Sequence, residues 1–121
     1  APYPAAVQDA HYAIRWLKHK AKELNGDPTH FGVLGSSSGG HIAQLLAMKP
    51  NDPKYAAIPF PEAPQLDATF SYVATRSPIS DPIARRAQAD RKGNKQMLKN
   101  SDTFFSAPGS IEEGNPQAIL D

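Results

Sequence analysis

The chain has 121 residues, which lies in the common range for one domain, so at most one hydrophobic core is expected. Its formal net charge of +1 gives no strong field and argues against nucleic acid, an anionic membrane surface or a polyacidic substrate as a partner. The lack of cysteine excludes disulfides, thiolate catalysis and cysteine metal sites, and no apolar run is long enough for a membrane span.

The first predicted element is an amphipathic helix, because apolar residues recur at alternating spacings of three and four. This apolar stripe consists of Val7, Ala10, Ile14, Leu17, Ala21 and Leu24. Basic residues between Lys18 and Lys22 would stabilise the carbonyl end of the helix, and Asn25 with Gly26 predicts a left-handed cap. The short apolar run at 31–34, bounded by turn residues, then predicts a central strand buried on both faces.

A second helical pattern covers residues 42–48, and Pro50 stops it. The proline-rich segment 50–66 predicts an extended surface loop, since proline removes backbone donors from regular structure. Alternation and β-favouring residues over 68–75 predict a second strand. The order strand, helix, strand implies parallel pairing through a right-handed crossover, so the fold class is α/β.

The remainder of the chain is predicted to be helices and loops. Asp81 followed by Pro82 is typical of a helix start, and this helix is expected to run to about Arg91. After an interruption at a glycine, the basic stretch 95–99 continues as helix. Ser110–Glu113 matches a capping box whose helix ends after about one turn.

The motif that carries chemistry is Gly-x-Ser-x-Gly, centred on Ser37 and placed between the predicted strand and helix. A serine at the tip of a tight strand-to-helix turn projects its hydroxyl above the sheet edge, as a nucleophile requires. Gly35 and Gly39 are predicted to leave room where the turn doubles back, and Gly40 to permit close packing. The backbone amide of Ser38, at the start of the helix, is predicted to be an oxyanion donor.

Other interpretations of single residues are weaker. The alternative interpretation of the motif is a glycine-serine turn without chemistry. A phosphate loop would need lysine and Ser/Thr where His41 and Ile42 stand. His41 follows Ser37 in the first helical turn, which favours a packing or hydrogen-bonding role over that of a general base. His11 and His19 are predicted to be solvated. A metal site at these two residues is not expected, because the sequence offers no third ligand near them.

The basic residues after position 84 are predicted to form a solvated surface, because little aromatic interleaving accompanies them as nucleic-acid binding would require. They are Arg85, Arg86, Arg91, Lys92, Lys95 and Lys99.

Several stretches together resemble the bacterial α/β-hydrolase esterases and lipases, a carboxylesterase-like family. They are 7–9 with 14–17, Asp27-Pro28, 35–41, 77–82 and 115–120. The resemblance implies a central part of an α/β-hydrolase fold that cleaves small-molecule carboxylic esters through an acyl-enzyme on Ser37, without cofactor or metal. It implies the Ser38 amide as an oxyanion donor and places Asp81 near the acyl pocket and cap, not as the triad acid.

Members of that family carry an upstream His-Gly-Gly type oxyanion loop, then an acidic residue and a histidine after the serine. Here all four histidines lie at or before position 41, so we expect the nucleophile-bearing section of a longer enzyme, inactive in isolation. The alternatives left open are a serine peptidase of the same fold and a non-catalytic α/β-hydrolase-like interaction domain. The expected organisation is 1–49 helix, strand, elbow and helix; 50–66 proline-rich loop; 67–76 strand; and 77–121 cap and substrate-side helices and loops.

Overall fold

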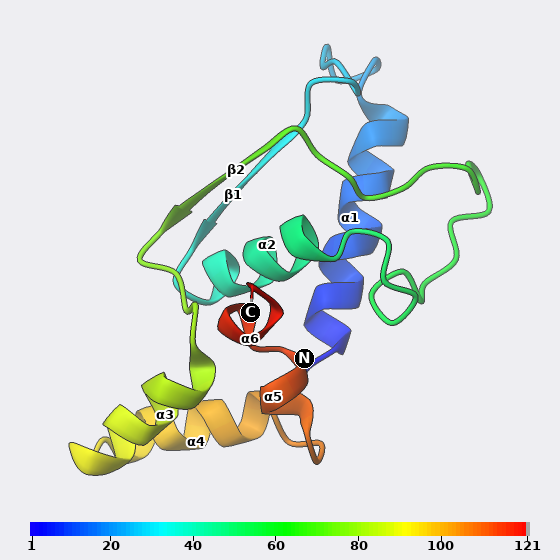
Figure 1. Ribbon diagram of the computed structural model, residues 1–121. Coiled ribbons are helices and arrows are strands. Elements are labelled where there is room, and N and C mark those ends of the chain that lie inside the picture. The colour runs from blue at the N-terminus through cyan, green and yellow to red at the C-terminus, as the bar shows by residue number, and fades with distance from the viewer. Residues whose placement is uncertain (121) are drawn as a thin grey trace.

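A computed structural model describes residues 1–120; Asp121, the last residue of the predicted cap segment, lies outside the described part. The described chain forms six helices and two strands (Figure 1). In chain order they are α1 (Ala5–Lys20), β1 (Gly32–Ser36), α2 (Ser38–Met48), β2 (Tyr72–Arg76), α3 (Pro82–Arg91), α4 (Lys95–Phe104), α5 (Ser110–Glu113) and α6 (Pro116–Leu120). Among these helices none is both long and apolar enough to cross a membrane.

The two strands pair in parallel, from Gly32 opposite Tyr72 to Ser36 opposite Arg76, which confirms the predicted crossover through α2. The second strand begins at Tyr72, four residues later than predicted. The reason is local: the Asp67 carboxylate accepts hydrogen bonds from the Thr69 amide at 3.0 Å and the Thr69 hydroxyl at 2.6 Å. This Asx turn bends the backbone where the sequence pattern suggested an extended strand.

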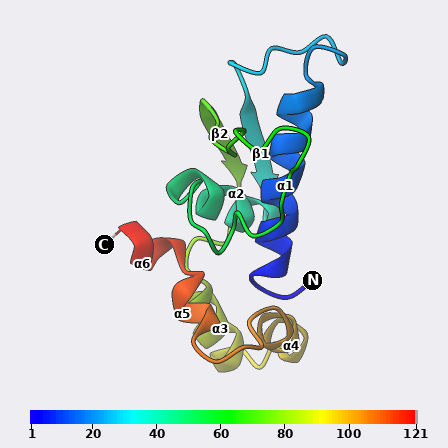
Figure 2. The same cartoon turned by 90° about the vertical axis from the view of Figure 1, so that its right-hand side faces the viewer.

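The prediction that β1 is buried on both faces is wrong for the described chain. α2 contacts both strands, and Val33 packs against the core. Leu34 points the opposite way and is 79% exposed, while Tyr72 on β2 is 65% exposed. Successive side chains of a strand alternate between faces, and no described segment covers the second face of this two-stranded sheet (Figure 2).

The first helix ends at Lys20, four residues before the end of the predicted apolar stripe. A turn follows in which Leu24 bonds the Lys20 and Ala21 carbonyls, both at 3.1 Å, and Gly26 bonds the Ala21 carbonyl at 2.7 Å. The left-handed residue of this cap is Asn25, with φ of 59°. Leu24 lies in this turn, beyond the end of the helix, and is 59% exposed; Leu17, inside the helix, is 40% exposed.

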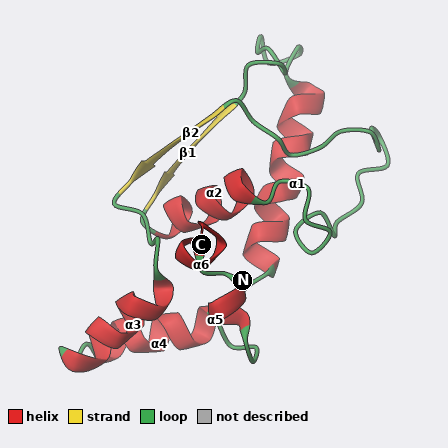
Figure 3. Cartoon of the chain, in the orientation of Figure 1, coloured by secondary structure: helices red, strands yellow, loops and turns green. Residues whose placement is uncertain are grey.

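The core lies between α1, α2 and the long loop that joins α2 to β2 (Figure 3). As predicted, this loop holds no helix or strand, but it is not merely a surface segment. Tyr55 is 1% exposed, and its hydroxyl lies 2.9 Å from that of Tyr3. Phe60, also in the loop, is buried as well. The loop therefore supplies large core side chains that α1 and α2 alone do not provide.

The helix start predicted at Asp81 is confirmed, since its carboxylate accepts a hydrogen bond from the Ala84 amide at 3.0 Å. α3 and α4 contact each other and lie together at the end of the molecule away from the strands (Figures 1 and 2). The Asn94 side chain caps the start of α4 by accepting from the Met97 amide at 3.0 Å, and α4 runs to Phe104, beyond the predicted 95–99.

The last two helices differ from the sequence-based prediction. The capping box at Ser110 is wrong: Gly109, with φ of 76°, takes the cap position, and the buried Ser110 hydroxyl has no hydrogen-bond partner in the described chain. α5 nevertheless lasts about one turn, as expected. α6 was not predicted, although the Asn115 side chain begins it by accepting from the Gln117 amide at 3.1 Å.

Candidate active site

Ser37 occupies the single-residue turn between β1 and α2. Its backbone has φ of 54° and ψ of −114°, a conformation that costs an L-residue on the order of 1–3 kcal/mol. Three backbone hydrogen bonds hold it there: its amide donates to Arg76 at 3.0 Å, and its carbonyl accepts from Ile79 at 3.2 Å and His41 at 3.2 Å. The strain is thus maintained by β2, the segment after β2, and the first turn of α2.

Two neighbouring glycines lie in close contacts. A Cβ at Gly35 would stand 2.4 Å from the Gly39 carbonyl oxygen and 2.7 Å from the Gly40 amide nitrogen. A Cβ at Gly40 would stand 2.7 Å from the Pro78 Cβ. Gly39 is different, because no described atom other than those of its chain neighbours and the adjoining backbone of α2 lies within 4 Å of its would-be Cβ. The crowding predicted at Gly39 is therefore wrong, whereas Gly35 lies close to the backbone of α2 and Gly40 lies close to Pro78.

The amide of Ser38 is the first N–H group of α2. The first N–H groups of an α-helix have no intrahelical acceptor, and the backbone dipoles add partial positive charge at this end. In α2 the His41 amide is already bonded to the Ser37 carbonyl. The amide donors that remain available at the start of the helix therefore lie immediately beside Ser37.

His41 is held away from the role of general base. It is 3% exposed, and its Nε2 lies 2.7 Å from the Gly114 carbonyl oxygen, so Nε2 carries the proton that it donates. Its ring makes edge contacts with Phe104 and Phe105. Within residues 1–120 no hydrogen bond joins His41 to the Ser37 side chain. The arrangement agrees with the packing and hydrogen-bonding role expected from the sequence.

Burial lowers the pKa of His41 below its ordinary value of 6.5, and the bond to Gly114 only partly opposes this. Above that value the ring is neutral in both folded and unfolded chains. Below it the unfolded chain binds a proton that the folded chain resists, so we expect the free energy of unfolding to fall as pH drops from 7.5 to 5.5. Urea denaturation at the two pH values checks this for the wild-type protein and the His41→Gln variant.

The variant should lose part of the pH dependence, while His19→Gln, at an exposed position, should keep all of it. The loss is only partial because burial also lowers the pKa of His11. An equal pH dependence in wild type and His41→Gln would contradict the role of His41.

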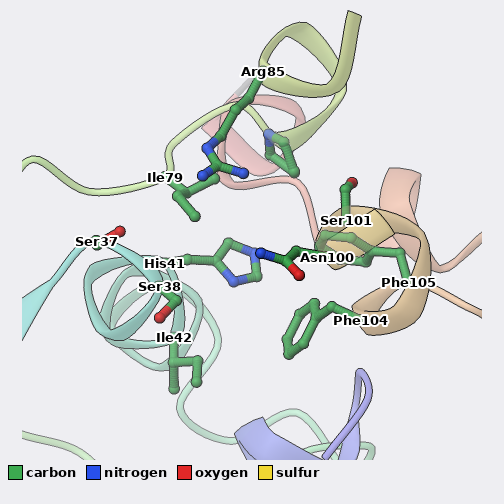
Figure 4. A pocket seen from close by; sticks show the side chains of 11 residues that line it. Ser37, Ser38, His41, Ile42, Ile79, Arg85, Asn100, Ser101, Phe104 and Phe105 are labelled. Carbon is green, nitrogen blue, oxygen red and sulfur yellow. The ribbon is translucent and has the colours of Figure 1, made fainter. Parts of the chain in front are cut away.

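A pocket of about 350 Å³ opens beside Ser37 (Figure 4). One wall is the first turn of α2 with Ile79, and the other comes from α3 and α4. Its lining residues are Ser37, Ser38, His41, Ile42, Ile79, Pro82, Arg85, Asn100, Ser101, Phe104 and Phe105. Asp81 does not line the pocket: it caps α3, whose first residue, Pro82, does.

Sequence reasoning missed the contribution of α4 to this pocket. Ser101 and Phe104 are three residues apart and lie on one face of α4, and Phe105 follows directly as the residue that ends the helix. The pattern was visible in the sequence, but the pairing of α3 with α4 was not. That pairing turns this face toward Ser37.

His11 was predicted to be solvated, and this is wrong. It is 2% exposed on α1, and its Nε2 lies 2.9 Å from the Pro50 carbonyl oxygen, because the loop after α2 folds over the helix. His19 is exposed, as predicted, and its ring contacts Phe60. In residues 1–120 no three side chains of the types that bind metals gather into a cluster.

Comparison with known proteins finds similar sequences in proteins that are named as ester hydrolases. Carboxylesterase NlhH of Mycobacterium tuberculosis is 43% identical over 51 residues, which are 42% of this chain and 16% of that protein. The probable carboxylic ester hydrolase LipM of the same organism is 38% identical over 53 residues, 44% of this chain and 12% of that protein. Ethyl acetate hydrolase of Pseudomonas putida is 31% identical over 97 residues, 80% of this chain and 27% of that protein.

The matched regions thus span between 12% and 27% of these relatives' own lengths. No solved structure matches the chain significantly. A sequence model of the BD-FAE family matches residues 1–112, a region that contains β1, α2, β2 and the pocket walls on α3 and α4. Because this match covers nearly all of the chain, the chain belongs to the BD-FAE family, which is α/β-hydrolase-like.

Proposed function

We propose that this chain is the nucleophile-bearing section of a serine hydrolase of carboxylic esters. The observation that carries the proposal is the strained turn at Ser37, which presents a serine hydroxyl at a pocket and beside the free amides of α2. A structural turn would gain stability from glycine at this position, so a strained serine favours a chemical role. The names of the relatives, carboxylesterase and ethyl acetate hydrolase, point to the same class of substrate.

In the proposed reaction the Ser37 hydroxyl oxygen attacks the acyl carbon of the ester, while its proton passes to a general base. The carbonyl oxygen becomes an oxyanion, which the Ser38 amide stabilises by a hydrogen bond. The intermediate collapses to an acyl-enzyme and an alcohol, which takes the proton back from the base. Water then attacks the acyl-enzyme in the same way, releasing the carboxylic acid and restoring the serine.

The general base must come from elsewhere in the protein, since the Nε2 of His41 is bound to the Gly114 carbonyl. A serine hydroxyl without a positioned base is a poor nucleophile at neutral pH. The proposal therefore assigns turnover to a longer protein that also supplies a histidine and an acidic residue. Residues 1–121 alone are expected to be inactive.

Covalent labelling tests the proposal. A fluorophosphonate reacts with serines that are activated as nucleophiles, so we expect the full-length protein that carries this segment to gain one phosphonyl group on Ser37. Mass spectrometry of the peptide that contains the turn gives the site of labelling. Ser36→Ala is the matched control, because Ser36 is exposed on β1 but does not line the pocket.

Labelling should be lost in Ser37→Ala and kept in Ser36→Ala. The chain of residues 1–121 should react much more slowly than the full-length protein, because it lacks the base. Rapid labelling of another serine in place of Ser37 would exclude Ser37 as the nucleophile.

A further inference from the structure

Arg85 on α3 lines the pocket beside Ser37 and brings a permanent positive charge to it. The sequence pattern placed Arg85 on a solvated basic surface, but in the structure it is half-buried. Figure 4 shows it extending from α3 with its nitrogen atoms beside Ile79, on the side of the pocket opposite Phe104. None of the lining residues within the described chain is Asp or Glu.

The neighbouring arginine on α3, Arg86, differs from Arg85 because its guanidinium is paired with a carboxylate. Arg86 binds the Asp102 carboxylate through two hydrogen bonds, Nε to Oδ1 at 2.7 Å and Nη2 to Oδ2 at 3.1 Å. Asp81, one turn before Arg85, directs its carboxylate at the Ala84 amide. No ion pair within residues 1–120 includes Arg85. Its charge is therefore available to a ligand in the pocket.

The rest of the lining separates into an apolar part and a polar part. Ile42, Ile79 and the two phenylalanines at the end of α4, Phe104 and Phe105, form apolar walls near Ser37. Asn100 and Ser101 on α4 are polar; the Asn100 side-chain oxygen accepts a bond from Gln96 at 2.8 Å, which leaves its amide nitrogen able to donate. The pocket thus fits a molecule with an apolar stem and an end that accepts hydrogen bonds.

We propose that Arg85 binds a carboxylate carried by the ester substrate, so that the substrate class is esters with a free carboxylate beyond an apolar spacer. Arginine suits this role because its planar guanidinium matches the geometry of a carboxylate with two parallel hydrogen bonds. A half-buried position strengthens such a contact relative to one in bulk water. The inference rests on the proposed function, since it describes the substrate of the same site.

Two pairs of substrates test the inference in the full-length protein. Monoethyl glutarate carries the carboxylate on the acyl side, and ethyl pentanoate is its neutral partner. 4-Acetoxybutanoate carries the carboxylate on the alcohol side, and butyl acetate is its neutral partner. For at least one pair we expect the ratio of kcat/KM, charged over neutral, to fall about tenfold or more in Arg85→Gln, as expected for loss of a charge-assisted hydrogen bond.

Two further variants separate recognition from general effects of charge. Arg85→Lys keeps the positive charge but cannot form the two parallel hydrogen bonds of a guanidinium. The charged-over-neutral ratio of kcat/KM for this variant should therefore lie between those of wild type and Arg85→Gln. Arg86→Gln removes an equal charge one residue away, outside the pocket lining, and should leave the ratio unchanged. Ratios that are equal in wild type and Arg85→Gln for both pairs would overturn the inference, as would an equal fall in Arg86→Gln.

A binding measurement distinguishes failure of this inference from failure of the proposed function. Calorimetry with glutarate should show binding to the wild-type protein and at least tenfold weaker binding to Arg85→Gln. Absence of ester hydrolysis together with Arg85-dependent glutarate binding would refute the esterase proposal and support the carboxylate site. Hydrolysis of the neutral esters without any glutarate binding would support the esterase and refute the carboxylate site.

Discussion

Ser37→Ala is expected to lower kcat/KM for ester hydrolysis by about 10⁴-fold or more in the full-length protein, without lowering its melting temperature. The catalytic loss would follow from removing the proposed nucleophile, because loss of the nucleophile in serine hydrolases leaves only the contribution of binding and the oxyanion donors. Stability should be unaffected because the Ser37 side chain is exposed and makes no hydrogen bond within residues 1–120. Hydrolysis of ethyl acetate and thermal unfolding of the same samples measure both effects.

Ser37→Gly tests whether the backbone of this turn is strained. Like Ser37→Ala, this variant lacks the hydroxyl and should be inactive. Because glycine adopts positive φ without steric cost, Ser37→Gly should be more stable than Ser37→Ala by about 1 kcal/mol, reduced by the conformational entropy that glycine loses on folding. Substantial activity in either variant would exclude Ser37 as the nucleophile. A lower melting temperature for Ser37→Gly than for Ser37→Ala would contradict the view that Ser37 is held under strain.

What could be predicted from the sequence was determined by residues close together in the chain. The start of α3 at Asp81 and Pro82, and the stop of α2 before Pro50, depend on side chains that act within a few residues of themselves. The parallel pair also followed from local patterns, because strand, helix and strand in this order permit few topologies.

The parts that could not be predicted depend on contacts between distant segments. Tyr55 lies in a proline-rich loop whose composition suggests exposure, yet its hydroxyl meets Tyr3, 52 positions away. His11 is covered by the loop carbonyl of Pro50, 39 positions away. For the same reason Arg85 was assigned to the surface: only the packing of α3 and α4 reveals that it faces the pocket of Ser37.

The two outer glycines of the Gly-x-Ser-x-Gly motif also differ in a way that the sequence does not predict. Gly35 and Gly39 are equivalent in the pattern, and the sequence predicts that both leave room for the turn. In the structure only Gly35 meets backbone atoms, because β1 runs directly toward the first turn of α2, whereas Gly39 faces open space. Substitutions at these two positions should therefore have opposite effects.

Gly35→Ala is expected to reduce the free energy of unfolding by about 1–3 kcal/mol or more, the usual cost of overpacking a close contact. The new Cβ would stand 2.4 Å from the Gly39 oxygen and 2.6 Å from its carbonyl carbon, and backbone atoms cannot move aside as a flexible side chain can. The start of α2 must shift, which also moves the Ser38 amide relative to Ser37. Ester hydrolysis should therefore fall along with stability.

Gly39→Ala is the matched control, since it adds the same methyl group two residues after Ser37, but into open space. Alanine also favours helix over glycine by up to about 1 kcal/mol, so this variant should unfold at the same urea concentration as wild type or at a higher one. Urea denaturation of the three full-length proteins at one pH gives the comparison. Two results would contradict the view that the close approach of β1 to α2 at Gly35 requires glycine there. One is a Gly35→Ala variant that unfolds at the wild-type urea midpoint, and the other is a Gly39→Ala variant that is less stable than Gly35→Ala.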